Sequence, residues 1–227
     1  MQCIDLAVRK FLCGLAIAVL PITAGCWSSD TAPPTASINT SNYGGVTPSK
    51  SVPERRLLNL HPMVLMRTSA GEFTVELDAE HAPLTVDNFL SYVQTGQYDG
   101  TIFHQVYDNF IVLGGGYDPN FTQRPTQPPL RNEAHNGLKN RRGTIAMARQ
   151  LDSIDSATCQ FFINLGNNTT LDFSGSEPEQ YGYCVFGKVI KGMEVIDQIA
   201  NSKVHSTPQF ENVPERPVVI ESIRCVP

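Results

Sequence analysis

Short apolar runs, separated by segments that contain glycine and proline, dominate residues 63–227. Apolar and polar residues alternate over residues 73–77, which predicts a strand with one buried face. From Pro83, apolar residues recur at helical spacing until Gly96, which predicts a helix that ends at this glycine. Further β-prone runs lie at residues 63–68, 101–106, 110–113, 143–148, 161–164, 184–189 and 218–223, and a second helical segment lies at 193–200. This pattern indicates a mostly β domain that closes into a barrel or a sandwich.

The N-terminal segment has a different character. Arg9 and Lys10 precede a mostly apolar run at residues 11–24, which is shorter than the roughly 20 residues that a membrane-spanning helix needs. This arrangement predicts a signal peptide over residues 1–25. The run ends in Thr-Ala-Gly-Cys, which resembles a bacterial lipobox with Cys26 as the lipidated first residue of the mature chain. The alternative is an ordinary cleaved signal peptide followed by an incidental cysteine.

Residues 26–62 are rich in serine, threonine, proline, glycine and asparagine. Such a segment buries too little apolar surface to offset the entropy lost on ordering. We therefore expect a flexible tether that holds a domain of residues 63–227 away from a membrane. A proline-rich ligand for another protein is the alternative, but no PxxP repeat supports it. The sequence thus predicts an exported protein of the bacterial periplasm, anchored in a membrane as a lipoprotein through Cys26.

Composition narrows the range of partners and cofactors. A formal net charge of −5 leaves no uniformly basic surface, which argues against nucleic acid as a partner. The six cysteines show no CxxC or CxxH spacing and the five histidines are scattered, so we expect neither a metal site nor another cofactor. Among the body cysteines, Cys159, Cys184 and Cys225, an exported protein could form one disulfide or none.

Five segments of the chain carry motifs that composition alone does not explain. Residues 103–116 read FHQVYDNFIVLGGG, residues 143–149 read GTIAMAR, and residues 156–164 read SATCQFFIN. Residues 183–193 read YCVFGKVIKGM, and residues 212–220 close the pattern with NVPERPVVI. In order and spacing these motifs resemble the cyclophilins, whose signatures include FHRVxPxFxxQGG, and the likeness is greatest to the periplasmic cyclophilins of bacteria. The resemblance covers residues 63–227.

The resemblance implies a closed eight-stranded antiparallel barrel capped by two α-helices, in a monomeric peptidyl-prolyl cis/trans isomerase. Its substrates would be X-Pro segments of unfolded or exported proteins. The reaction is rotation about an amide with a barrier of about 18–20 kcal/mol, and it needs no nucleophile. Carried over residue by residue, the catalytic positions are Gln105, Phe110 and Gln160, and the substrate-binding positions are Ile111, Leu113, Ala148, Phe162, Leu171 and Tyr183. Without the motifs, the apolar members of this set would be assigned to the barrel core.

Three positions depart from the family pattern. Gln105 stands where the family has its catalytic arginine, Leu113 where it has a glutamine, and Thr170 where an aromatic ring flanks the pocket. A glutamine amide can donate a hydrogen bond but lacks the charge that strengthens one. Losing about 1.5 to 3 kcal/mol of transition-state stabilisation lowers a rate roughly 10- to 150-fold. We therefore expect reduced isomerase activity with the proline pocket intact.

Two hypotheses stand beside the isomerase. Gln105 and Leu113 favour a proline-peptide binding module or chaperone that kept the fold and lost efficient catalysis. A membrane-tethered structural protein is supported only by the tether. Arg149, beside the predicted site, is expected to be a solvated surface arginine.

Overall fold

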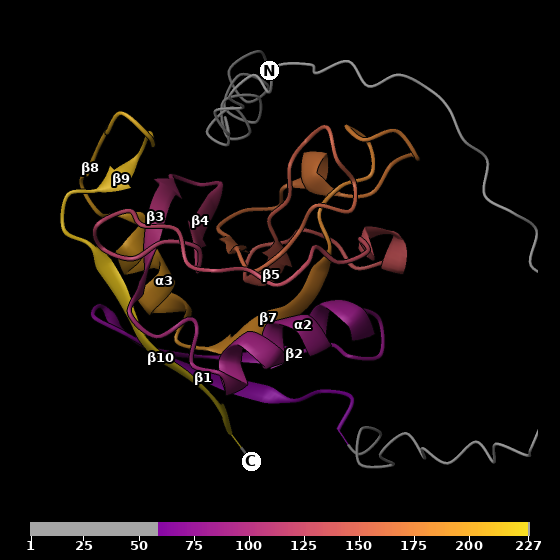
Figure 1. Ribbon diagram of the computed structural model, residues 1–227, viewed down its shortest axis with the longest axis horizontal. Coiled ribbons are helices and arrows are strands. Elements are labelled where there is room, and N and C mark those ends of the chain that lie inside the picture. Colours follow the sequence, from indigo (N-terminus) through magenta and orange to yellow (C-terminus); the bar gives the residue numbers. More distant parts are fainter. Residues whose placement is uncertain (1–58, 227) are drawn as a thin grey trace, which may run out of the picture. The chain divides into compact units, whose positions relative to one another are not determined.

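The computed structural model describes residues 59–226. The predicted signal peptide, Cys26 and most of the predicted tether lie outside the described residues. The described chain forms a closed antiparallel barrel in the strand order β1-β10-β3-β4-β6-β5-β7-β2 (Figure 1). The barrel strands are β1 (Met63–Thr68), β2 (Gly71–Leu77), β3 (Thr101–Tyr107), β4 (Ile111–Gly114), β5 (Thr144–Met147), β6 (Phe161–Asn164), β7 (Val185–Lys191) and β10 (Val218–Val226). The predicted eight-stranded barrel is confirmed.

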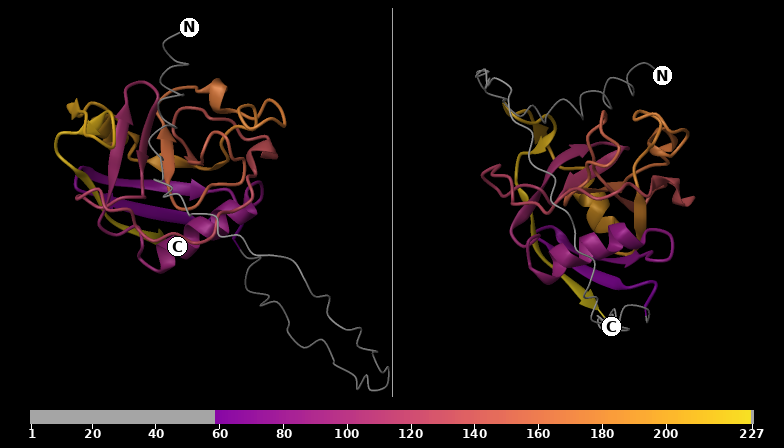
Figure 2. Two further views of the ribbon diagram at one scale, coloured as in Figure 1. Left: turned by 45° about the horizontal axis from the view of Figure 1, so that its top comes forward. Right: turned by 45° about the vertical axis from the view of Figure 1, so that its right-hand side comes forward.

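The two predicted helices are present, as α2 (Pro83–Gln94) and α3 (Met193–Ala200). Both pack apolar side chains into the same core as the strands, and α2 lies in the lower half of the barrel in both views of Figure 2. Short elements complete the fold: the 3-10 turns η2 (Ala134–Asn136) and η3 (Thr169–Leu171), and a two-stranded sheet of β8 (Val204–His205) and β9 (Val213–Pro214). This small sheet was not predicted, because two residues are too few to show a periodic pattern.

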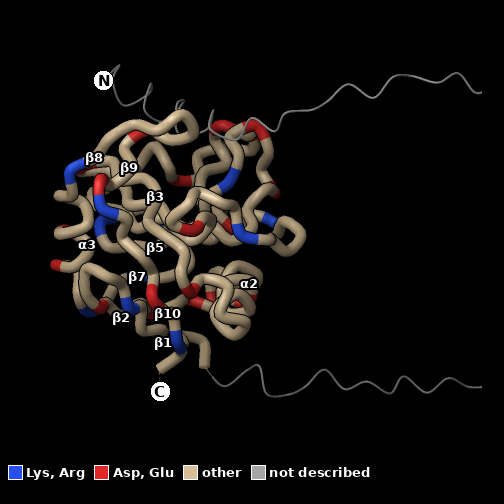
Figure 3. The backbone as a smooth tube through the Cα atoms, turned by 60° about the vertical axis from the view of Figure 1, so that its left-hand side comes forward, with Lys and Arg blue, Asp and Glu red and all other residues tan. Residues whose placement is uncertain are grey.

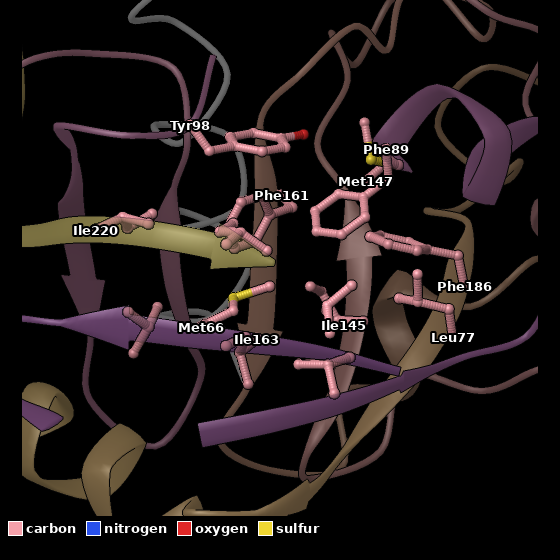
Figure 4. Packing of buried hydrophobic residues seen from close by; sticks show 14 of the residues in the cluster. Met66, Leu77, Phe89, Tyr98, Ile145, Met147, Phe161, Ile163, Phe186 and Ile220 are labelled. Atoms are coloured by element: carbon pink, nitrogen blue, oxygen red, sulfur yellow. The ribbon is translucent and has the colours of Figure 1, made fainter. Parts of the chain in front are cut away.

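A group of aromatic rings packs in the barrel core beside aliphatic side chains such as Ile145 and Ile163 (Figure 4). Phe161 of β6 presents its ring edge-on to three neighbours, with centroids 5.8 Å from Phe89, 5.4 Å from Tyr98 and 6.1 Å from Phe103. Tyr98 also satisfies its buried hydroxyl by donating to the carbonyl oxygen of Cys159 at 2.8 Å. Because edge-to-face packing favours one arrangement of rings, this cluster fixes α2 against β6 and β3.

A distant carboxylate caps helix α2. Ala82, at the N-cap position, has no side chain that could accept a hydrogen bond from the first turn. The buried carboxylate of Glu133 accepts instead from the backbone N–H of Leu84 at 3.2 Å and of Thr85 at 2.9 Å, and from the Thr85 hydroxyl at 2.7 Å. An anion at a helix N-terminus is favourable, because free N–H groups and the helix dipole meet there. This contact fastens the long loop between β4 and β5 to the helix.

A β-bulge interrupts strand β3. Its pairing with β4 shifts between Phe103 and Gln105, so the residue between them, His104, is the extra one. His104 leaves the barrel interior and packs edge-on against Tyr117 and Phe210, at centroid distances of 4.8 Å and 5.2 Å. The bulge therefore turns two consecutive side chains, those of His104 and Gln105, to the outside of the barrel.

Three cysteines lie in the described part of the chain, and all are free. Cys159 and Cys184 are buried, whereas Cys225 is exposed near the end of β10. Of the two possibilities that the sequence left open, the structure therefore has no disulfide within residues 59–226. In that same range, no helix has the length and apolar character needed to cross a membrane.

Candidate active site

The strand register brings predicted site residues into one row on the outside of the barrel. Gln105 of β3 lies opposite Leu113 of β4, and Leu113 lies opposite Phe162 of β6. Phe162 in turn pairs with Ala146 of β5, which pairs with Val185 of β7. Because alternate residues of a strand share a face, this row points away from the core-facing residues beside it.

Side chains around this row form a second hydrophobic cluster, separate from the barrel core. Loop residues Leu171 and Tyr183 cover it, and Phe110 and Ala148 pack at its margin and stay half-buried. The buried members are Ile111, Leu113, Ala146, Phe162, Leu171, Tyr183 and Val185. Every predicted apolar site residue therefore lies in or against this cluster, and we name it the proline pocket. The cluster is separate from the barrel core, to which these residues would be assigned without the motifs.

Gln160 lies beside the pocket, at the start of β6. Its carbonyl oxygen accepts a hydrogen bond from the backbone N–H of Ala148 at 2.9 Å, so these two predicted residues are neighbours. The Gln160 side chain turns towards Gly116 and hydrogen-bonds the Tyr117 hydroxyl. A side chain at position 116 would collide with Gln160, so a glycine is required for this approach.

Both N–H donors of the Gln105 amide are used within the protein. Its Nε2 donates to the Tyr107 hydroxyl at 2.9 Å and to the carbonyl oxygen of Glu211 at 3.1 Å. A glutamine amide has two N–H donors, so neither is free for a substrate while both contacts persist. The Gln105 side chain also bridges strand β3 to the segment before β9, which is far away in sequence.

Tyr183 brings the one unpartnered buried hydroxyl of the proline pocket. Its ring lies edge-on to Phe162 with centroids 5.7 Å apart, and only 4% of the residue is exposed. The buried hydroxyl has no hydrogen-bond partner within the described residues. Burial raises the pKa of Tyr183 to about 12, against the opposing effect of nearby Arg149. The hydroxyl is therefore neutral at physiological pH, and its capacity to donate a hydrogen bond is unused within the described residues.

Arg149 is buried, so its prediction as a solvated surface residue was wrong. Its guanidinium lies over the Tyr183 ring, 5.0 Å from the centroid. Four backbone carbonyls accept its N–H groups, those of Gly182 at 2.8 Å, Gln150 at 2.7 Å, Leu151 at 3.0 Å and Pro178 at 2.6 Å. Burial lowers the pKa of Arg149. No sequence pattern indicates this role, because all four acceptors are loop carbonyls that periodicity does not place.

The arrangement suits binding and twisting of an amide better than bond cleavage. It offers an apolar cluster, a buried neutral hydroxyl and Gln160 next to the cluster. Within residues 59–226 no group of three or more histidine, cysteine or acidic side chains could hold a metal ion. Rotation about an amide needs no nucleophile, only an environment that stabilises the twisted form more than the planar one.

Known proteins resemble this chain over its whole barrel. Residues 63–225 match the family described as cyclophilin type peptidyl-prolyl cis-trans isomerase/CLD. Peptidyl-prolyl cis-trans isomerase A of Dickeya dadantii is 48% identical over 163 residues, which cover 72% of this chain and 84% of that protein. Peptidyl-prolyl cis-trans isomerase B of Escherichia coli is 45% identical over 161 residues, covering 71% and 98%. A Cryptosporidium parvum cyclophilin crystallised in the presence of the dipeptide Ala-Pro superposes with a TM-score of 0.63 at 26% identity, covering 73% and 99%.

Proposed function

This chain belongs to the cyclophilin family of peptidyl-prolyl cis/trans isomerases, and from that premise we propose that it accelerates X-Pro rotation in unfolded or exported polypeptides, at a reduced rate. The observation that carries the proposal is the proline pocket itself. Its cross-strand row and covering residues form an apolar cluster on the outside of a closed barrel. Catalysis then rests on holding the prolyl ring and favouring the twisted amide.

The state of Gln105 supports the reduced rate. Its amide is neutral, and both of its N–H groups already donate to Tyr107 and Glu211. A donor to the prolyl nitrogen would have to give up one of these bonds in the transition state. Charge-assisted hydrogen bonds are roughly twice as strong as neutral ones, so this position stabilises a pyramidal nitrogen less than arginine would.

The same observation favours a second candidate, a proline-peptide binding module. Gln105 engaged with its own chain and Leu113 in place of a polar side chain leave the apolar contacts of the pocket intact. Binding needs only those contacts, whereas catalysis needs a preference for the twisted amide. The two candidates therefore share the pocket and differ in rate.

One experiment separates the two candidates. Cis/trans exchange of a short Ala-Pro peptide is measured by NMR with the wild-type protein and with Gln105→Arg. An isomerase accelerates exchange, and Gln105→Arg increases the acceleration by roughly 10- to 150-fold. Phe110→Ala serves as the control that removes a wall of the pocket and lowers both binding and rate. If both proteins bind the peptide and neither accelerates its cis/trans exchange, the chain is a proline-peptide binding module and not an isomerase.

Export and membrane anchoring belong to the same proposal. A signal peptide over residues 1–25, a lipid on Cys26 and a tether up to residue 62 would hold a monomeric barrel at the periplasmic face of a membrane. Lysines and arginines are interspersed with acidic residues along the described backbone (Figure 3), and this mixture supports the expectation that nucleic acid is not a partner. Metabolic labelling with a palmitate analogue tests the anchor: label on the wild-type chain that Cys26→Ser abolishes supports it, and an unlabelled wild-type chain refutes it.

A further inference from the structure

A cleft of about 680 Å³ lies beside the proline pocket. Four parts of the chain line it: the end of β3 with the turn into β4, residues 167–170, the segment from the end of α3 into β8, and Asn212 just before β9. Figure 1 shows β3, β4, α3, β8 and β9 on one side of the molecule. The volume falls in the range of pockets that hold small ligands, and it exceeds the needs of one amino-acid side chain.

The cleft is continuous with the proline pocket. Phe110 and Thr170 line the cleft, and Phe110 also packs at the margin of the proline pocket. Thr170 stands at the position where the cyclophilin motif carries an aromatic ring. A threonine is much smaller than such a ring, so it leaves room along this boundary. Because the two sites share Phe110, the cleft is within reach of side chains close to a proline held in the pocket.

The walls of the cleft are largely apolar. Val106, Phe110 and Ala200 contribute to them, together with Val204 of β8. Val204 is 40% exposed, one of few large apolar side chains in the described chain that solvent reaches to this extent. An apolar ligand group seated in the cleft would remove this surface from water, which is favourable in proportion to the area covered.

Hydrogen bonds hold the walls in place before any ligand binds. The carbonyl oxygen of Phe110 accepts from the backbone N–H of Leu165 at 2.9 Å and from Nδ2 of Asn168 at 2.8 Å. On the other wall, the backbone N–H of Val106 donates to the carbonyl oxygen of Asn212 at 2.9 Å. A preformed site loses less entropy on binding than a mobile one.

One charge marks the rim. Asp108 is the sole residue with a formal charge among those that line the cleft, and its carboxylate accepts a hydrogen bond from Nδ2 of Asn109 at 2.9 Å. An acidic ligand group would be repelled by this carboxylate and would also lose hydration against apolar walls. Both the carboxylate and the apolar lining therefore disfavour an acidic ligand group.

We propose that the cleft is a specificity subsite that takes a bulky apolar side chain, such as phenylalanine or leucine, within two residues of the isomerised proline. The inference rests on the proposed function, since the peptide reaches the cleft through a proline held in the pocket. It makes the protein selective among X-Pro sites, with apolar neighbours preferred over alanine and acidic neighbours disfavoured.

The test uses the peptide Ala-Ala-Ala-Pro-Ala-Ala and a matched set in which phenylalanine or glutamate replaces one alanine within two residues of the proline. Affinity is read from NMR titration and rate from cis/trans exchange. At one position we expect phenylalanine to bind roughly tenfold tighter than alanine, as partial burial of its ring requires. Glutamate at that position should bind more weakly than alanine.

Paired variants locate the effect. Val204→Glu should abolish the phenylalanine preference, whereas Ile190→Glu should keep it, because Ile190 is exposed to a similar 38% on β7 and does not line the cleft. Ser202→Phe provides a second variant, since its own ring would fill the cleft. Equal affinity of the wild-type protein for alanine and phenylalanine peptides overturns the subsite, as does a preference that survives both cleft variants. A protein that neither binds nor accelerates the alanine peptide overturns the proposed function instead.

Discussion

His104 should make the protein sensitive to mild acid. It is 1% exposed, and its Nδ1 has no partner within the described residues. Burial lowers its pKa from 6.5 to about 3, partly offset by a hydrogen bond with the backbone of Ile102. Between pH 6.5 and 3, His104 is therefore protonated in the unfolded chain and neutral in the folded chain. Stability is complete above pH 6.5 and falls as the pH drops through this window.

The size of the effect follows from the two pKa values. Between pH 7 and pH 5, one histidine with these values removes about 2 kcal/mol from the free energy of unfolding. His104→Gln cannot take up the proton, so its free energy of unfolding should depend less on pH by this amount. Other groups, including Asp78 and His81 with their shifted pKa values, titrate equally in both proteins and cancel in the difference.

The assay is urea unfolding of both proteins at pH 7 and pH 5. Circular dichroism is the suitable signal, because the single tryptophan, Trp27, lies outside the described barrel. The comparison uses the difference between the two pH values within each protein, so a general cost of the substitution drops out. Equal pH dependence in the two proteins, to within about 0.5 kcal/mol, would refute the assignment of a buried neutral imidazole.

Three further predictions concern single side chains. Glu133→Gln should lower the free energy of unfolding by about 1–3 kcal/mol, because α2 loses its charged cap, whereas Glu72→Gln, at an exposed ion pair with Arg67, should change it by under about 1 kcal/mol in urea unfolding. Tyr183→Phe should weaken peptide binding or exchange several-fold without loss of stability, since the hydroxyl removed has no partner in the folded protein; a destabilised variant would contradict this. Cys225 should react promptly with a thiol reagent in the native protein while Cys184, whose pKa burial raises to about 12, reacts only on unfolding; peptide mapping that finds label on Cys184 before unfolding would disprove the burial.

The sequence predicted the positions of the helices and strands better than it predicted which strands pair. Strand β6 and helix α3 lie where the apolar runs predicted them, because periodic burial is a local property of the chain. Periodicity left barrel and sandwich open, and the motif resemblance decided between them. The choice depends on pairings such as β10 with both β1 and β3, which join distant parts of the chain.

The motifs indicated most residues of the candidate site, but not the hydrogen bonds that these residues make. The motifs named the residues of the proline pocket, which the register then gathered. The partner of Gln105 is a carbonyl 106 residues away, and the four acceptors of Arg149 are loop carbonyls. Backbone carbonyls look alike in every sequence, so no residue pattern indicates which of them a side chain will reach.

The bulge in β3 has a consequence for how this gene can vary in length. Strand β3 already contains one residue more than its partner at this point, so deleting His104 would restore a regular strand with Gln105 still outside and Val106 still inside. In β4, whose pairing with β6 is continuous, the loss of one residue would exchange the inner and outer faces and turn Leu113 inward. Natural selection can therefore accept a single-codon deletion at the bulge of β3, whereas a single-codon deletion in the adjacent strand β4 would disrupt the barrel.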